Sequence, residues 1–191
     1  MSDDARTIDD NRRARRLAAS GWLIIALSAG AAILPFVDPG NGALVIGGML
    51  IAAGLIEVMA ATVRHQTRML ALLAGAVTIL AGLLFATDNA THFLSTLTII
   101  MGWLFARSLI LAASALLESG SARRWTALSA ATDFLLSAAL AIGLSISALI
   151  VTLFGATGDL VTSFAWVLAI SFIATGTLLL ELASIARRED V

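Results

Sequence analysis

The chain has 191 residues, of which 59% are hydrophobic and only 13% are charged, and its mean hydropathy is +0.96. Soluble domains carry about 25% charged residues, so this composition excludes an ordinary soluble protein and indicates membrane spans. The absence of cysteine excludes disulfide bonds, thiolate metal sites and cysteine nucleophiles.

Six apolar segments follow an N-terminal tail in which acidic residues and arginines alternate. The tail, residues 1–16, is expected to be solvated, with Asp9 or Asp10 as the N-cap of the first helix. The predicted transmembrane domain covers 17–186, and a second charged tail covers 187–191. Its spans are about 17–37, 43–63, 69–86, 93–117, 126–154 and 160–186.

Turn residues and charges set the boundaries of these spans. The first segment follows arginines, as in a secretory signal peptide, but its length and the five segments after it indicate a retained span. It ends at Asp38-Pro39-Gly40, where proline cannot continue the helix and glycine accepts positive φ. The fifth segment is longer than a bilayer requires, so we expect it to tilt or to break near Gly143.

The distribution of arginines predicts the orientation. Eleven of the twelve basic residues, all of them arginines, lie in the two tails and in the second and fourth loops. The other three loops carry no arginine and contain Asp38, Asp88 and Asp159. The positive-inside rule therefore places both termini in the cytoplasm. The loops are too short for catalysis outside the membrane, so we expect no enzyme.

An internal repeat follows from the same pattern. Each pair of spans leaves from an arginine-marked side, turns at one of the three acidic loops and returns to the arginine-marked side. The expected fold is therefore an all-α membrane protein with six transmembrane helices built as three parallel helical-hairpin repeats. Many secondary transporters are built from inverted repeats instead, so this pattern weakens a transporter interpretation without excluding it.

Short motifs at matching places in the repeats carry a resemblance to a known family. They are Gly21-Trp22-Leu23, Pro39-Gly40, Gly54-Leu55-Ile56-Glu57 and Leu104-Phe105-Ala106-Arg107. In these motifs, and in its three hairpins, the chain from Gly21 to Arg188 resembles the HdeD-like family of bacterial acid-resistance membrane proteins. It departs from the family pattern where the second and third turns lack proline. The resemblance implies an inner-membrane protein linked to survival of acid stress, with no established catalytic chemistry.

Four ionisable residues lie inside predicted spans: Glu57, Arg107, Asp133 and Glu181. At about 1.5 Å per helical residue, Arg107 lies roughly 15 Å and Asp133 roughly 12 Å from the cytoplasmic ends of their spans. Charges inside a membrane are costly, so these two residues are expected to pair, and one short loop joins their spans. Glu57 is a second candidate partner for Arg107.

This intramembrane charge cluster has three interpretations. It is an ion pair that locks adjacent helices, a proton-responsive cluster that releases Arg107 when Glu57 or Asp133 is protonated, or part of a relay for transport. As functions, these correspond to a non-enzymatic protein of acid or envelope stress tolerance, and to a pathway for protons or a small solute. A third possibility is an accessory subunit that docks on a larger membrane complex.

Small residues spaced four apart are expected to pack helices closely. The pairs are Ala26 and Gly30, Gly48 and Ala52, Ala71 and Gly75, and Ala139 and Gly143. Trp22 and Trp125 are interpreted as interfacial anchors, whereas Trp103 and Trp166 lie deeper and are expected to pack or to contact lipid.

The sequence predicts neither a cofactor nor a metal. His65 and His92 are expected on opposite sides of the membrane and so cannot share an ion. The basic loops are too sparse to bind nucleic acid and suit the anionic headgroups of membrane lipids instead. A homo-oligomer or a larger membrane complex is a further possible assembly.

Overall fold

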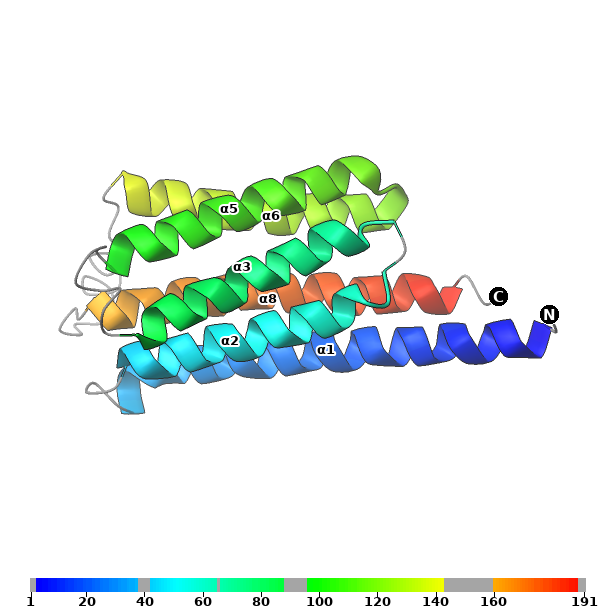
Figure 1. The fold of residues 1–191 in the computed structure, drawn as a ribbon, viewed down its shortest axis with the longest axis horizontal. Coiled ribbons are helices and arrows are strands. Elements are labelled where there is room, and N and C mark those ends of the chain that lie inside the picture. The colour runs from blue at the N-terminus through cyan, green and yellow to red at the C-terminus, as the bar shows by residue number, and fades with distance from the viewer. Residues whose placement is uncertain (1–2, 38–41, 65, 88–95, 143–159, 189–191) are drawn as a thin grey trace.

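The computed structural model describes residues 3–37, 42–64, 66–87, 96–142 and 160–188. Within these ranges the regular elements are six α-helices, so the expected all-α class is confirmed (Figure 1). They are α1 (Asp3–Val37), α2 (Gly42–Ala61), α3 (Arg68–Ala86), α5 (Thr96–Leu117), α6 (Gly120–Ala141) and α8 (Leu160–Arg188).

Five of these helices are long and apolar enough to cross a membrane: α1, α2, α3, α5 and α8. The helix α6 is not among them, because Arg123, Arg124 and Asp133 lower the hydropathy of its described part. The chain therefore has the helices of a multi-pass membrane protein.

Two helices begin earlier than predicted. The helix α1 begins at Asp3, so the N-cap expected at Asp9 or Asp10 is wrong, and the charged tail is helical from Asp3 onward. The helix α6 begins at Gly120, after Ser119 in an extended conformation. Gly120 has a φ of 63°, a conformation that glycine adopts without steric cost. The described part of α6 ends at Ala141, and the rest of the predicted fifth span lies outside the described residues.

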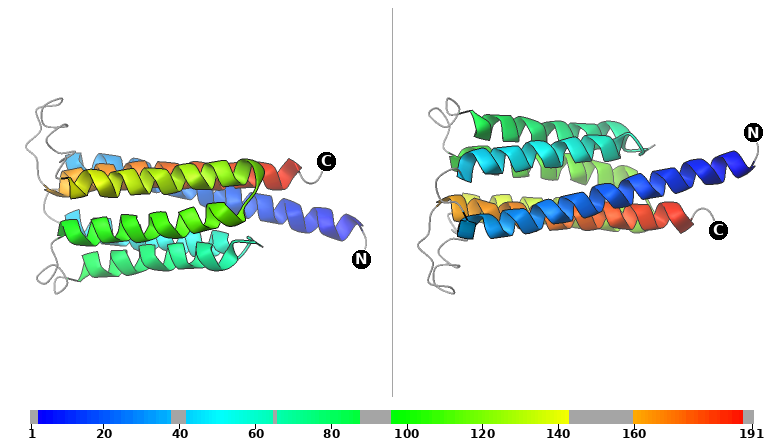
Figure 2. Two further views of the ribbon diagram at one scale, coloured as in Figure 1. Left: turned by 90° about the horizontal axis from the view of Figure 1, so that it is seen from above. Right: turned by 90° about the horizontal axis from the view of Figure 1, so that it is seen from below.

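The six helices form a closed ring in the order α1, α2, α3, α5, α6, α8, with α8 returning to α1 (Figures 1 and 2). The most extensive contacts join α1 to α8, α2 to α3 and α5 to α6. The two helices within each predicted hairpin unit, α1–α2, α3–α5 and α6–α8, are also neighbours, but they contact each other less extensively than the three pairs above. The packing pairs are therefore offset by one helix from the predicted repeat units.

Glycines explain the closeness of two of these pairs. A Cβ atom at Gly54 would lie 2.7 Å from the carbonyl oxygen of Gly75, and one at Gly47 would lie 2.8 Å from that of Gly82. Between α1 and α8, a Cβ at Gly21 would lie 2.9 Å from the oxygen of Gly176. Because any larger residue would push the backbones apart, these glycines fix the distances between the paired helices.

The residues predicted to pack helices at four-residue spacing differ in their surroundings, and the glycines in contact on α2 and α3 are seven residues apart. A Cβ atom at Gly30 would lie 3.3 Å from Met49 Cε on α2. Gly75 is at a helix contact and Ala71 is buried, whereas a Cβ atom at Gly48 would have no neighbouring atom within 4 Å. The others are Ala26 and Gly30, which are exposed, Ala52 and Ala139, which are half-buried, and Gly143, which lies outside the described residues.

The start of α1, the end of α8 and the connections α2–α3 and α5–α6 lie at one end of the bundle (Figure 1). We call this the arginine end; its described arginines lie in the first part of α1, in the α2–α3 connection, at the starts of α3 and α6 and at the end of α8. The four groups that the sequence predicts on one side therefore lie at one end of the bundle. That this side is cytoplasmic stays a prediction.

Candidate functional site

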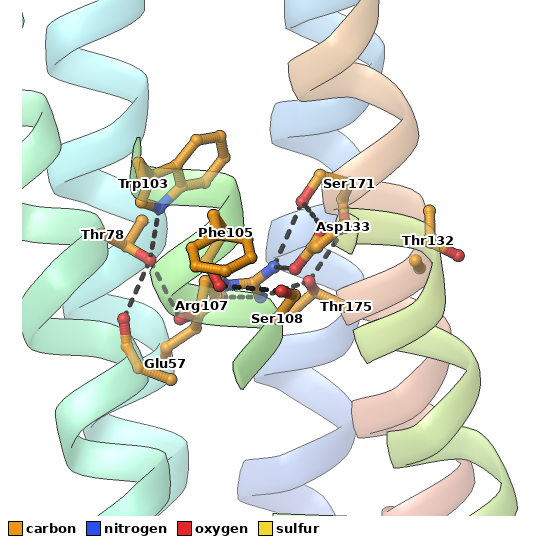
Figure 3. Close-up of polar contacts among 12 residues, drawn as sticks. Glu57, Thr78, Trp103, Phe105, Arg107, Ser108, Thr132, Asp133, Ser171 and Thr175 are labelled. Atoms are coloured by element: carbon orange, nitrogen blue, oxygen red, sulfur yellow. Dashed lines mark hydrogen bonds and ion pairs between the residues drawn. The ribbon is translucent and has the colours of Figure 1, made fainter. Parts of the chain in front are cut away.

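Arg107 on α5 lies inside the helix ring, with 1% of its surface exposed (Figure 3). It is the only charged residue of α5 and places a long cationic side chain in the interior of the bundle. A buried guanidinium needs both counter-charges and hydrogen-bond acceptors to offset its lost hydration.

Two carboxylates flank this guanidinium. Arg107 Nη1 donates to Asp133 Oδ2 on α6 at 2.5 Å, and Nη2 donates to Glu57 Oε1 on α2 at 2.6 Å. The ion pair predicted between Arg107 and Asp133 is present, and Glu57 is a second partner, so both candidates bind the same cation. The helices α2 and α5 are not neighbours in the ring, so Arg107 reaches across its interior.

Two hydroxyl groups from α8 complete the cluster. Ser171 Oγ accepts from Arg107 Nη1 at 3.1 Å and donates to Asp133 Oδ1 at 2.6 Å. Thr175 Oγ1 accepts from Arg107 Nη2 at 2.6 Å and donates to the carbonyl oxygen of Ser171. Neither residue was predicted from the sequence. The signal that could have found them is a pair of hydroxyl residues spaced four apart, and thus on one helix face, within an apolar span.

A further polar contact orients Glu57. The hydroxyl oxygen of Thr78 on α3 lies 3.5 Å from Glu57 Oε2, accepts from Trp103 Nε1 at 3.2 Å and donates to the carbonyl oxygen of Ala74. Trp103 is 4% exposed, so the packing role expected for it is confirmed, and its indole N–H has a partner. The cluster therefore joins α2, α3, α5, α6 and α8 through side chains (Figure 3).

The central charges do not balance within the cluster. With both carboxylates ionised, one guanidinium faces two anions, and a single proton on either carboxyl group would make the three groups neutral. A second proton would leave Arg107 as a buried cation without a counter-ion, which is strongly unfavourable in a low dielectric. The cluster can therefore hold one proton without losing its central ion pair, but not two.

A small void adjoins the cluster. It has a volume of about 30 Å³ and is lined by Glu57, Arg107, Thr175 and Arg64, among others. The Nε atom of Arg107 is buried and has no hydrogen-bond partner among the described residues. The void is large enough for a water molecule.

The remaining predicted site residues lie elsewhere. Glu181 makes no described contact with Arg107; it is half-buried on α8 and accepts a hydrogen bond from Ser121 near the arginine end. Trp22 is 63% exposed, and Trp125 is half-buried. His65 and His92 lie outside the described residues, and within the described part of the chain no group of three acidic or histidine side chains could hold a metal ion.

Comparison of the chain with family models, with curated proteins and with solved structures found no match in any of the three.

Proposed function

We propose that this chain is a non-enzymatic protein of a bacterial inner membrane, of the HdeD-like type, that serves tolerance of acid or envelope stress. In this proposal the Arg107 cluster locks the helix ring while at least one carboxylate stays ionised. Acid stress delivers the second proton, which releases Arg107 and loosens the bundle. The observation that carries the proposal is a fully buried guanidinium whose only described counter-charges are two titratable carboxyl groups.

The sequence motifs behind the resemblance support this assignment. Glu57 closes one of these motifs and Arg107 closes another, and the two side chains form an ion pair at 2.6 Å. Residues that stand fifty positions apart in separate repeats thus meet in the candidate site.

We also propose that α6, with the residues that follow it, forms a sixth span, and that both termini are cytoplasmic. The helix α6 stands in the ring between α5 and α8, two helices long and apolar enough to span a membrane. Its 22 residues measure about 33 Å, against about 30 Å for the hydrocarbon core. The helices α1, α3 and α6 all start at the arginine end, which supports three parallel hairpins (Figure 1).

Charge-neutral variants of the two carboxyl groups test the locking role. Glu57→Gln, Asp133→Asn and the double variant are compared in detergent by thermal unfolding from neutral pH to about pH 3, near the usual range for carboxyl titration. The last ionised carboxylate is paired in the folded state and unpaired in the unfolded state. Acidification that protonates both carboxyl groups leaves Arg107 as a buried cation without a counter-charge, so stability is expected to fall as the pH falls.

The variants distinguish the pH dependence that Glu57 and Asp133 cause from the pH dependence that other acidic residues cause. Each single variant keeps one carboxylate and is expected to keep the acid-induced fall, whereas the double variant is unstable already at neutral pH and loses this part of the fall. Glu181→Gln is the matched control and is expected to follow the wild type. If the double variant showed the same pH dependence of thermal stability as the wild type, the proposed pH switch would be ruled out. If cells lacking the protein survived acid challenge as well as the wild type, the proposed physiological role would be ruled out.

A proton pathway is the second candidate, and one observation favours it. Arg64 lines both the small void beside Glu57 and a larger cavity at the arginine end, so the cluster lies one side chain away from that cavity. Proton flux into liposomes that contain the purified chain tests this function. Flux that disappears in the Glu57→Gln variant would support it, and flux no greater than in protein-free liposomes would exclude it.

A further inference from the structure

The larger cavity lies at the arginine end and has a volume of about 470 Å³. Its walls come from α1, from the α2–α3 and α5–α6 connections, from the first turn of α6 and from α8. This size falls within the range of small-molecule binding pockets. Neither Arg107 nor any of the residues that bind it lines this cavity, so a ligand site there goes beyond the proposed function.

Arg64, in the α2–α3 connection, is the most unusual residue of this cavity. Only 8% of its surface is exposed, yet its Nε and Nη2 atoms have no hydrogen-bond partner among the described residues. It also forms no described ion pair. Buried polar groups in folded proteins are almost always satisfied, so a buried guanidinium with two unpartnered nitrogen atoms points to a group that is absent from the structure.

A second guanidinium lines the same cavity. Arg13 on α1 is half-buried, and its Nε atom is also buried without a partner among the described residues. The pKa of Arg64 is lowered, mainly by burial, while the charges of Glu118 and Glu57 oppose this effect and the neighbouring charge of Arg13 adds to it. Two cations that repel each other in a partly dry cavity are stabilised by an anion that binds between them.

The first turn of α6 supplies further donors. Ser119, Gly120, Ser121 and Ala122 all line the cavity, and the side chain of the N-cap residue Ser119 makes no capping hydrogen bond. The backbone N–H groups of a helix N-terminus have no partner within the helix and carry a partial positive charge. Together with arginines, such a terminus forms a typical phosphate-binding arrangement.

The only acidic side chain that lines the cavity among the described residues is Glu118. Its Oε1 atom accepts a hydrogen bond from Thr67, and its Oε2 atom accepts one from Thr126. Glu118 is thus engaged by two hydroxyl groups and forms no described ion pair with Arg64. Two arginines against one carboxylate leave the cavity with a net positive charge.

We infer that this cavity is a binding site for a phosphoryl group, held by Arg64, Arg13 and the N-terminus of α6. The phosphoryl group belongs either to the headgroup of an anionic phospholipid or to a free phosphate compound, since both present the same oxygens to guanidinium and backbone N–H donors.

The first experiment titrates the full-length protein in an uncharged detergent with inorganic phosphate at constant ionic strength. A saturable rise in unfolding temperature is expected. Arg64→Gln removes a charged donor and is expected to weaken the apparent affinity about tenfold or more. The matched control is Arg68→Gln, which changes an exposed arginine at the start of α3 that does not line the cavity, and it should respond like the wild type.

A second variant keeps the test decisive if Arg64→Gln does not fold. Ala122→Asp places a carboxylate in the first turn of α6, where it is favourable for the helix and competes for the same donors. This variant is expected to be more stable than the wild type without phosphate and to lose the response to phosphate.

A lipid experiment distinguishes the two sources of the phosphoryl group. The protein is reconstituted in nanodiscs of phosphatidylglycerol or of phosphatidylcholine, and the lipid that it retains after extraction is measured by native mass spectrometry. Retained phosphatidylglycerol that is lost in Arg64→Gln and kept in Arg68→Gln assigns a lipid headgroup. A response to inorganic phosphate without retained lipid assigns a free phosphate compound. Identical behaviour of the two arginine variants, or no response in either experiment, overturns the site.

Discussion

Arg107 makes four hydrogen bonds to side chains on three other helices, and two of its acceptors carry charge. Such a residue contributes little stability when compared with a well-packed apolar group, but removing it alone leaves its partners uncompensated. The effect of a substitution therefore depends on which charges remain, more than on which contacts are lost.

Arg107→Met leaves Glu57 and Asp133 as two buried carboxylates without a cation. We expect this variant to lose about 3–5 kcal/mol of stability at neutral pH. Its pH dependence should have the opposite sign to that proposed for the wild type. Without the guanidinium, two buried negative charges have no counter-charge, and protonation removes these charges, so stability is expected to rise as the pH falls.

Thermal unfolding of Arg107→Met across the acid range measures this sign. Ser108→Ala, which changes a buried neighbour whose hydroxyl donates to the carbonyl oxygen of Phe105 on its own helix, serves as the control. If stability fell as much on acidification in Arg107→Met as in the wild type, the buried charge of Arg107 would not be the cause of the loss of stability at acid pH.

The sequence predicts the charged residues of the Arg107 cluster far better than its neutral residues. Arg107, Asp133 and Glu57 are conspicuous because each would be costly in lipid without a partner. Ser171 and Thr175 could not be singled out, since hydroxyl groups are common in apolar helices and can bond to their own backbone. Arg64 was not expected to be buried, because a loop arginine beside a span is ordinarily interpreted as a topology signal.

Among the helices, the tight contact between α2 and α3 depends on glycine. Gly54→Ala adds a Cβ atom 2.7 Å from the carbonyl oxygen of Gly75, and the backbone there cannot move aside cheaply. We expect this substitution to destabilise the protein by about 1–3 kcal/mol, as overpacking does.

Gly48→Ala is the matched control on the same helix. Its new Cβ atom meets nothing within 4 Å, so only the helix propensity changes, and we expect a gain of about 0.5–1 kcal/mol. The difference between the two variants in denaturant unfolding is the measurement. Equal effects would mean that the contact between α2 and α3 does not fix their separation.

Helix ends were easier to predict than helix neighbours. The end of α3 at Ala86 and the end of α5 at Leu117 coincide with the predicted ends, because polar and charged residues follow both of them in the sequence. The contact faces are not marked in this way: lipid-facing and buried faces are both apolar in a membrane protein, and Ala and Gly are frequent on each. The glycines spaced seven apart on α2 and α3 therefore became visible only in the folded structure.

For the whole molecule, the gathering of arginines at one end is the feature with the widest consequences. Hydropathy and charge placement were sufficient to predict it, because each crossing reverses the side of the next loop. They could not predict that α8 packs against α1 and closes the ring. That contact joins the first and last helices, and the local pattern of hydropathy and charge does not indicate which distant helices are neighbours.

The compartment that the arginine end faces can be measured directly, because the natural chain has no cysteine and needs no background mutations. Ser119→Cys introduces an exposed thiol at the arginine end, and Thr87→Cys introduces one at the end of α3, at the opposite end of the bundle. In intact cells, a membrane-impermeant maleimide is expected to label the Thr87→Cys variant and to leave Ser119→Cys unlabelled until the membrane is permeabilised, because translocating eleven arginines is unfavourable. Labelling of Ser119→Cys alone in intact cells would invert the topology, and would place the arginine-lined cavity on the outer face of the membrane.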